Sequence, residues 1–346
     1  MLPYILLLVL LISVVFVESF SLGRKAFWLP ALFLIFFASI RSSSVGTDTV
    51  NYTYNFERSL NSMYYDFNNG MELGYQLLEY IILTCTDNYF WLFLISSIVV
   101  VLSYLITIKK LSINYFYSIF IFITFGFYTF FFNGLRQGLA MSICFLGLPY
   151  LLEKRIIPYF TVVFIASMFH ISALIMIPIY LLVNARFRLE YKVIACFIIS
   201  ILASQVLIGY LAQGNKRYEH YTQEVDQAGG YITLLFYSLI GLVVYFSSKK
   251  NRSENIYFNK FEQIFLCGLA LMFPIALLGT DPSGPQRILY YFTSMCIFLI
   301  PYILKKYNSI LINILFVLFS VIYFSMITMR FGDLYPYQIN PIFEVF

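Results

Sequence analysis

The chain has 346 residues, of which 61% are hydrophobic and 11% charged, and its formal net charge is +5. Together with a mean hydropathy of +0.81, this excludes a soluble globular domain, because the polar residues are too few to cover its surface. No P-loop, H-E-x-x-H or dinucleotide motif is present, and the five cysteines form no C-x-x-C pair. We therefore expect an all-α polytopic membrane protein that uses no metal or other cofactor and binds no nucleic acid.

A spanning helix needs roughly 17 to 25 apolar residues, and this length divides the chain into about twelve spans, some of them short or broken. The first run lacks a basic start and a cleavage site, so we expect a membrane anchor rather than a removed signal peptide. The predicted spans are 2–20, 27–41, 90–108, 114–133, 137–152, 156–169, 171–184, 192–211, 231–247, 261–279, 287–304 and 309–330.

Short basic connections recur at alternate ends of these spans. They are 23–25, 109–110, 153–155, 186–192, 247–252 with Lys260, and 305–306. Because Lys and Arg concentrate on the cytoplasmic side, we expect these connections there. The basic residues left outside are nearly all arginine, which can hold phosphate oxygens bidentately but can equally pair with acidic residues of the outer loops. They are Arg41, Arg58, Arg136, Arg217, Arg287 and Arg330, together with Lys216.

Two outer segments are long enough to carry a site. Segment 42–89 contains MELGYQLLEYIILTC, whose apolar residues recur at helical spacing over a length too short to cross a membrane. We predict an interfacial or re-entrant helix there. Segment 212–230 is charged and ends in Gly-Gly, which favours a flap over a site. Both belong to the single integral membrane domain that we expect for residues 1–346.

The segment 156–184 can form one tilted helix or a hairpin of two short helices. One helix would carry the basic connections 153–155 and 186–192 to opposite sides, so we predict the hairpin. Its arms of about fourteen residues rise only about 21 Å, less than the roughly 30 Å of hydrocarbon. His170 at the tip, and by the same reasoning Arg136 at the turn of its own helix pair, would lie in a recess open to the outer face.

Arg136 and Gln137 stand between two hydrophobic runs in FFNGLRQGLAMSICF. Ionisable groups at membrane depth are costly and are usually retained for function, although an arginine can also serve as an interfacial anchor. The second polar group and the flanking glycines favour a functional site. His170 either packs in the bundle or accepts a proton from a sugar hydroxyl, and we interpret His220 as a solvated loop residue.

Further candidates follow other predicted spans on the outer side. RSSSVGTDTVNY places Arg41, Asp48 and Tyr52 directly after a span. TDPSGPQRILYY places Asp281 and Arg287 in a loop stiffened by prolines. The acidic residues either orient hydroxyls or pair with arginines. Tyrosines of the outer loops suit stacking on sugar rings, although interfacial tyrosine belts account for much of the aromatic content.

Four stretches in this order, RSSSVGTDTVNY, NGLRQGLA, ASMFHISALIMIPIY and PQRILYYF, resemble the EpsG-type branch of the Wzy polysaccharide polymerases. The resemblance covers most of the chain, from Arg41 to Tyr291. It implies the GT-C-type fold of lipid-linked glycosyl polymerases and ligases, in the bacterial inner membrane, with a periplasmic active site. It also implies undecaprenyl-diphosphate-linked oligosaccharides as donor and acceptor, O-antigen or a related surface polysaccharide as product, and a chain-length regulator as a candidate partner.

This resemblance gives the candidate residues their roles. Guanidinium groups in a recess would stabilise the charge that develops on the departing diphosphate, without a metal. We expect Arg136 and Arg287 on the donor diphosphate, with Arg41 in support. His170 is the candidate base for the acceptor hydroxyl and Asp48 is the reserve. The remaining candidate binding residues are Gln137, Tyr52, Asp281 and Arg217.

Other functions remain open on the same residues. An O-antigen ligase would share the fold and the donor and differ only in its acceptor. A polysaccharide flippase should place its arginines along a path open to both sides, whereas the predicted arginines lie at outer turns. A membrane acyltransferase could use His170, but its donor route usually opens to the cytoplasm, where the connections are short and rich in lysine.

Overall fold

The computed structural model describes residues 1–58, 63, 65–214, 231–248, 252, 255–277, 285–330 and 332–343. Within these ranges the regular elements are all helices, apart from one isolated bridge between Arg41 and Ile339. The chain divides into two compact units, one formed by Met1–Ile177 with Leu304–Phe346 and the other by Pro178–Ile303. The all-helical fold class is confirmed, and the GT-C-type fold stays a prediction.

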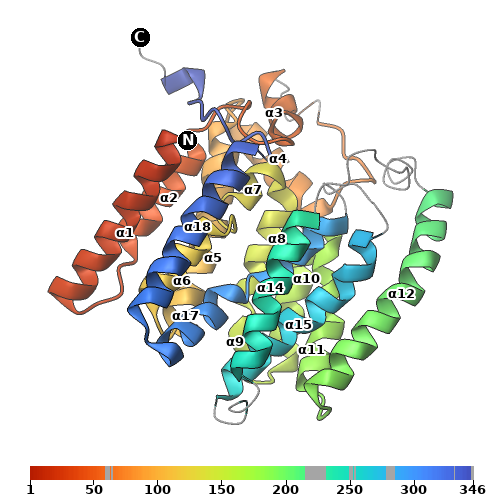
Figure 1. Ribbon diagram of the computed structural model, residues 1–346. Helices are drawn as coiled ribbons and strands as arrows, with labels where there is room; N and C mark the ends of the chain where they lie inside the picture. The colour runs from red at the N-terminus through yellow and green to blue at the C-terminus, as the bar shows by residue number, and fades with distance from the viewer. Residues whose placement is uncertain are drawn as a thin grey trace. The chain divides into compact units, whose positions relative to one another are not determined.

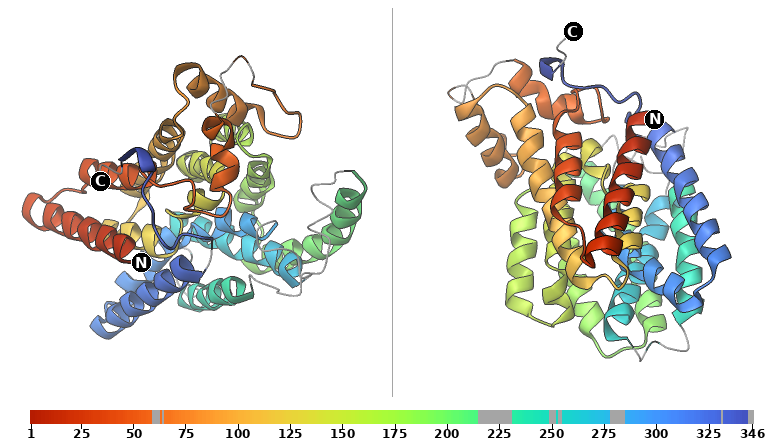
Figure 2. Two further views of the ribbon diagram at one scale, coloured as in Figure 1. Left: turned by 90° about the horizontal axis from the view of Figure 1, so that it is seen from above. Right: turned by 90° about the vertical axis from the view of Figure 1, so that its left-hand side faces the viewer.

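The first unit is built around α5 (Phe90–Leu111), which packs against α2 and α8 and is more buried than the other long helices of this unit. Two helices, α3 and α4, precede it at one end of the unit (Figures 1 and 2). We predicted α4 but not α3. The other elements of this unit are α1 (Leu2–Leu22), α2 (Trp28–Ser39), α3 (Thr49–Glu57), α4 (Leu73–Cys85), α6 (Tyr115–Thr124), α7 (Phe130–Asn133), α8 (Leu135–Leu146), α9 (Leu148–Leu152), α10 (Ile156–Ser167), η2 (Ile171–Ile175), α18 (Ile310–Arg330) and η4 (Pro341–Phe343).

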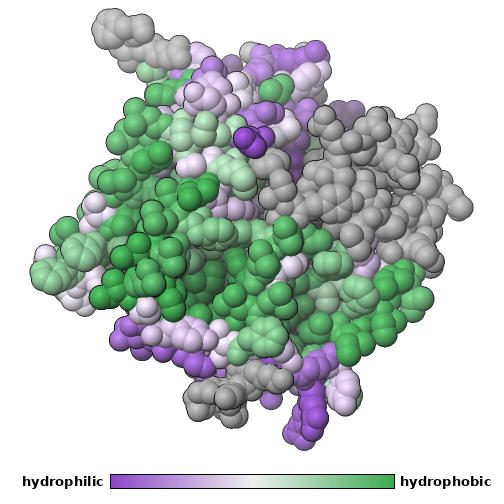
Figure 3. Space-filling view, in the orientation of Figure 1, coloured by the Kyte–Doolittle hydropathy of each residue, from purple (hydrophilic) through white to green (hydrophobic). Residues whose placement is uncertain are grey.

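The surfaces of α1 and α18 are apolar. Only 28% of the most apolar window of α1 and 17% of that of α18 is buried inside the protein. Figure 3 shows hydrophobic side chains over this part of the first unit, with hydrophilic residues towards its two ends. Such a continuous exposed apolar surface fits lipid and not water.

Four helices in the described parts of the chain are long and apolar enough to cross a membrane: α1, α5, the Ile256–Ile275 part of α15, and α18. Most of the other predicted spans coincide with shorter or broken helices, whereas 192–211 lies within the 26-residue helix α12 (Leu189–Gly214). The predicted span 114–133 consists of α6 and α7, separated by a turn in which Gly126 has a φ of 79°. The chain is therefore a multi-pass membrane protein, and the number of twelve spans stays a prediction.

The predicted hairpin in segment 156–184 is confirmed up to the boundary of the first unit. The helix α10 ends at Ser167, the chain turns, and η2 packs back against α10. The Tyr159 hydroxyl donates to the carbonyl oxygen of Met176 across the two arms, at 3.3 Å. α11 (Met176–Asn184) continues from η2, and His170 lies at the turn, as expected.

Connections that we predicted to be cytoplasmic lie together in the first unit. The Lys25 Nζ donates to the carbonyl oxygen of Lys109 at 2.7 Å, and Lys110 forms an ion pair with Glu153 at 3.7 Å. The helices α3 and α4 lie at the opposite end (Figure 2). The lysine-rich connections and the loops with the candidate site are thus separated along the helix axes, as the predicted topology requires.

The segment 332–340 returns to the end of the first unit that carries α3. The backbone nitrogen of Ser42 donates to the carbonyl oxygen of Gln338 at 2.9 Å, and that of Asn340 donates to Ile40 at 2.7 Å. Residues distant in sequence therefore form a short two-stranded contact that covers the end of α2.

In the second unit, α12 (Leu189–Gly214) and α14 (Tyr231–Ser248) both pack on α15 (Ile256–Leu277). Arg252 donates to both carboxylate oxygens of Glu262, at 2.9 to 3.2 Å, and to Glu190 at 2.9 Å. Glu190 and Arg252 lie in the predicted cytoplasmic connections 186–192 and 247–252, and Glu262 lies beside Lys260. The ion pairs of Arg252 therefore link these connections. The remaining elements of this unit are most of α11, η3 (Pro285–Ile288), α16 (Leu289–Thr293) and most of α17 (Cys296–Tyr307).

Candidate functional site

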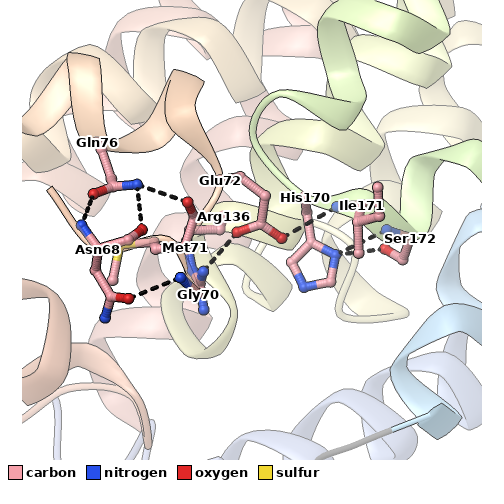
Figure 4. A network of polar contacts seen from close by, with 9 residues as sticks. All are labelled: Asn68, Gly70, Met71, Glu72, Gln76, Arg136, His170, Ile171 and Ser172. Atoms are coloured by element: carbon pink, nitrogen blue, oxygen red, sulfur yellow. Dashed lines mark hydrogen bonds and ion pairs between the residues drawn. The ribbon is translucent and has the colours of Figure 1, made fainter. Parts of the chain in front are cut away.

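Arg136 lies in the first turn of α8, directly after the break at Gly134, and its side chain is only 10% exposed. Its Nη1 donates to the Oε2 of Glu72 at 2.6 Å (Figure 4). A charge placed so deeply must be compensated, because removing an ion from water costs several kcal/mol even after relaxation. The carboxylate of Glu72 supplies that compensation.

Glu72 joins three elements of the first unit. It stands at the N-terminus of α4, but its carboxylate makes no hydrogen bond to its own helix. Its Oε1 instead accepts a hydrogen bond from the backbone nitrogen of Ile171, the first residue of η2, at 3.2 Å. One carboxylate therefore links α4 both to α8 and to the turn of the α10–η2 hairpin.

The start of α4 lies directly against this hairpin turn. The backbone nitrogen of Gly74 donates to the carbonyl oxygen of Met168 at 2.8 Å. A Cβ at position 74 would lie 2.7 Å from that oxygen and 2.8 Å from the Cβ of Met168. Only glycine allows the two backbones to approach this closely, and the approach brings Glu72 within reach of Ile171.

His170 is fixed by the residue two positions later. Its Nδ1 accepts a hydrogen bond from the backbone nitrogen of Ser172 at 3.2 Å and lies 2.7 Å from the Ser172 Oγ. A ring nitrogen that accepts from a backbone N–H carries no proton, so this network assigns the proton of the neutral ring to Nε2. His170 then presents a hydrogen-bond donor at Nε2. The predicted role as a base would need the other tautomer, with Nδ1–H directed against the Ser172 N–H.

Polar side chains follow one face of α4 and its cap. Glu72, Tyr75, Gln76 and Glu79 are spaced i, i+3, i+4 and i+7, and the last three are at most 4% exposed. Gln76 accepts from the backbone nitrogen of Asn68 at 2.7 Å and donates to its carbonyl oxygen at 2.9 Å. The loop before α4 is thereby tied to the helix, and this holds Glu72 in position.

Glu79 is buried farther along the same face. Its two carboxylate oxygens accept hydrogen bonds from the Tyr65 hydroxyl at 2.8 Å and from the Asn55 amide at 3.2 Å. Burial raises the pKa of this carboxyl above its usual value, although the two hydrogen bonds and the charge of Arg136 act in the opposite direction. Glu79 therefore connects α4 to α3 and to the loop between them.

Two tyrosines complete the surroundings of Arg136. The guanidinium carbon lies 5.9 Å from the centroid of the Tyr75 ring. The ring of Tyr52, from α3, lies edge-on to Tyr75 with centroids 5.8 Å apart, and Tyr52 lies close enough to Arg136 to interact with it. Predicted candidates from three separate stretches, Tyr52, Arg136 and His170, thus gather around Glu72.

Arg41 lies outside this group. Its side chain is 0% exposed, its Nη1 donates to the Ala38 carbonyl oxygen at 2.6 Å, and its guanidinium carbon lies 3.7 Å from the Phe93 ring centroid and 4.4 Å from that of Phe132. The contact between segments 40–42 and 338–340 covers it. In this arrangement a diphosphate cannot reach Arg41, because aromatic rings and backbone surround it, so we leave it out of the proposed site.

The other predicted site residues lie partly in the first unit, partly in the second, and partly outside the described residues. Gln137 is buried beside Arg136 in α8, and Asp48 is partly buried at the start of α3. Arg287 is in η3 of the second unit. Asp281, Arg217 and most of the predicted flap at 212–230 lie outside the described residues, as does His220. In the parts that the structure describes, no cluster of three or more His, Cys, Asp or Glu could hold a metal ion.

The sequence reasoning missed Glu72, Tyr75, Gln76 and Glu79. A signal was present, because polar residues at i, i+3, i+4 and i+7 in an otherwise apolar helix define one face. A polar face that turns towards the protein needs polar partners. Arg136 and the tyrosines of segment 42–89 are partners of this kind.

A family profile matches most of the chain. The EpsG family profile covers residues 25–339, which include Glu72, Arg136 and His170. The chain belongs to the EpsG family. This is a family of Wzy-like polymerases, which gives the protein a role in polysaccharide biosynthesis in a membrane. Neither the curated proteins nor the solved structures contain a match to the chain.

Proposed function

We propose that this member of the EpsG family polymerises oligosaccharide repeat units carried on undecaprenyl diphosphate. The reaction transfers the growing glycan from its lipid diphosphate to a sugar hydroxyl of the next lipid-linked unit, at the periplasmic face of the inner membrane. The observation that carries the proposal is the buried Arg136, placed with Glu72 and His170 at the end of the first unit opposite the lysine-rich connections. O-antigen or a related surface polysaccharide is the proposed product.

Arg136 is the proposed contact to the donor diphosphate. A guanidinium binds phosphate oxygens bidentately, and in a buried place it stabilises the negative charge that grows as the diphosphate leaves. Its ion pair with the carboxylate of Glu72 supports this role. His170 donates from Nε2 to a phosphate or glycosidic oxygen. Arg287 is proposed as a second cation on the diphosphate.

The remaining candidates are proposed for the sugars. Tyr52 is proposed to contact the sugar next to the diphosphate with its ring or hydroxyl, and Gln137 and Asp48 are proposed to hydrogen-bond to sugar hydroxyls. Asp281 and Arg217 are proposed to contact the sugars or a diphosphate of the lipid-linked units. A chain-length regulator is a proposed protein partner.

The test is the surface glycan of cells that lack this protein and are complemented with variants of equal membrane expression. Arg136→Lys keeps the charge but loses the fork, and Arg58→Lys is the matched control, because Arg58 is exposed and stacks on Tyr54 at 4.2 Å. We expect Arg136→Lys to remove the long glycan ladder while single repeat units stay on display. Removal of one oxyanion donor costs about 10²- to 10³-fold in rate, so the loss should be visible.

The pattern of the glycan separates the candidate functions. Loss of single units together with the ladder in the deletion strain would indicate a ligase or a flippase. A full ladder in Arg136→Lys would mean that the bidentate contact is not used. The same ladder in the deletion strain and in wild type would refute the proposed function.

A further inference from the structure

The donors that hold Glu72 are those of an anion site. They are one guanidinium N–H, at 2.6 Å, and one backbone N–H at the hairpin turn, at 3.2 Å. Both types of donor bind phosphate oxygens in proteins. The carboxylate of Glu72 therefore occupies the position that the first phosphate of a lipid-linked donor would take on Arg136.

The transfer also needs an acceptor for the proton of the attacking hydroxyl. The lone pair of the His170 Nδ1 is used by Ser172, so the ring offers a donor. Both oxygens of Glu79 already accept hydrogen bonds, and its side chain is 3% exposed. Glu72, in contrast, is less buried, and its carboxylate contacts both Arg136 and the His170 turn.

We propose that Glu72 is the proton acceptor of the transfer and that the donor diphosphate releases it from Arg136. This rests on the proposed function. While Glu72 is held by Arg136 and Ile171, its carboxylate is directed at these two donors and not at an acceptor hydroxyl. A diphosphate that takes over the guanidinium frees the carboxylate next to the reacting sugar, so the base becomes available only when the donor is bound.

The step balances without a further reactant. The oxygen of the acceptor hydroxyl forms a bond to the anomeric carbon of the donor sugar, and the bond between that carbon and the phosphate oxygen breaks. The undecaprenyl diphosphate leaves with the electron pair. The hydroxyl proton goes to a carboxylate oxygen of Glu72, which passes it to solvent or to the departing diphosphate before Arg136 is re-engaged.

Glu72→Gln separates this role from a structural one. Glutamine keeps the length of the side chain and one carbonyl oxygen to accept from Arg136 or Ile171, but it cannot take up a proton. The control is Glu57→Gln, because Glu57 is exposed at the end of α3. Purified proteins in lipid nanodiscs are assayed for single-turnover transfer between lipid-linked repeat units and for binding of undecaprenyl diphosphate.

We expect Glu72→Gln to slow transfer by about 10²- to 10⁴-fold, the usual contribution of a general base. Its affinity for undecaprenyl diphosphate should equal or exceed that of wild type, because the competing charge is gone. Glu57→Gln should match wild type in both. For Glu72→Ala, added formate should restore transfer in a saturable way, which the loss of a purely structural clamp would not permit.

Two results would overturn the inference while the proposed function stands. One is a transfer rate of Glu72→Gln within about threefold of wild type, because removal of a general base should slow transfer far more than that. The other is a parallel loss of transfer and diphosphate binding in Glu72→Gln with no formate rescue of Glu72→Ala, which would make Glu72 a support for the site. Absence of transfer by the wild type with any lipid-linked unit would refute the proposed function, and the inference with it.

Discussion

The close approach of α4 to the hairpin turn makes Gly74→Ala an informative substitution. The added methyl would lie 2.7 Å from the Met168 carbonyl oxygen, so the two backbones must separate by about 0.7 Å to reach an ordinary contact of 3.4 Å. The same shift would lengthen the hydrogen bond from Ile171 to Glu72, now 3.2 Å, beyond hydrogen-bonding range. We therefore expect the substitution to detach Glu72 from the hairpin turn.

The energetic sign follows from two opposing terms. Overpacking costs about 1 to 3 kcal/mol, and alanine in place of glycine in a helix returns at most about 1 kcal/mol. The middle of the overpacking range, about 2 kcal/mol, less the full return of about 1 kcal/mol leaves a net loss of about 1 kcal/mol. This should lower the Tm by roughly 2 to 4 °C for a unit of about two hundred residues. Thermal unfolding in detergent, followed by the exposure of buried cysteines to a thiol-reactive dye, measures it.

Gly70→Ala is the matched control in the loop before α4. A Cβ at position 70 meets no backbone atom, and its nearest neighbour is the Asn68 Oδ1 at 3.3 Å. We expect Gly70→Ala to keep both the Tm and polymerisation, and Gly74→Ala to lose polymerisation even below its Tm. If the two variants behave alike, contact between α4 and the hairpin is not what positions Glu72.

Three other predictions concern separate parts of the chain. Because burial raises the pKa of Glu79 above 4.5, the folded protein binds this proton more tightly than the unfolded chain, so stability should fall as pH rises from about 4.5 through the raised pKa. Glu79→Gln should flatten that part of a Tm-against-pH curve, and an unchanged slope would contradict it. The exposed Cys85, at the end of α4, should react with an impermeant maleimide from the periplasmic side, whereas Lys110→Cys in a Cys85→Ser background should react only in opened membranes; the reverse pattern would invert the topology. Arg252→Ala should cost about 3 to 5 kcal/mol by leaving the fully buried Glu262 without its bidentate partner. Lys110→Ala should cost at most about 1 kcal/mol, because its ion pair is exposed, and equal losses of Tm in these two variants would contradict the reasoning.

Hydrophobic spacing and charge predicted the parts of the fold that depend on local sequence. The hairpin at His170 and the break before Arg136 follow from the length of the spans and from the positions of the basic connections. Both features can be read from a single continuous segment of the chain. The contact between Glu72 and these two places joins residues 64 and 99 positions apart. Hydrophobic periodicity carries no information on contacts between residues so far apart in the sequence, so the contacts of Glu72 could be found only from the tertiary structure.

Arg41 and Arg136 also show that sequence alone does not predict what surrounds a side chain. Each is an arginine at the outer end of an apolar run, and we predicted both near the donor diphosphate, Arg136 in contact with it and Arg41 in support. They differ in what lies against them: aromatic rings and a distant backbone segment around Arg41, and a carboxylate in a partly open place at Arg136. The tautomer of His170 is likewise set by the position of one backbone N–H, which the residue types alone do not define.

The contact between the end of α2 and the segment 332–340 has a consequence for how the protein is made. The Ser44 side chain binds Gln338, 294 positions later, so the ribosome must complete nearly the whole chain before Arg41 is covered. Until then the guanidinium of Arg41 has its aromatic and Ala38 contacts but lacks this covering segment. A chain truncated before this segment would lack the backbone contacts that cover Arg41 in the complete fold.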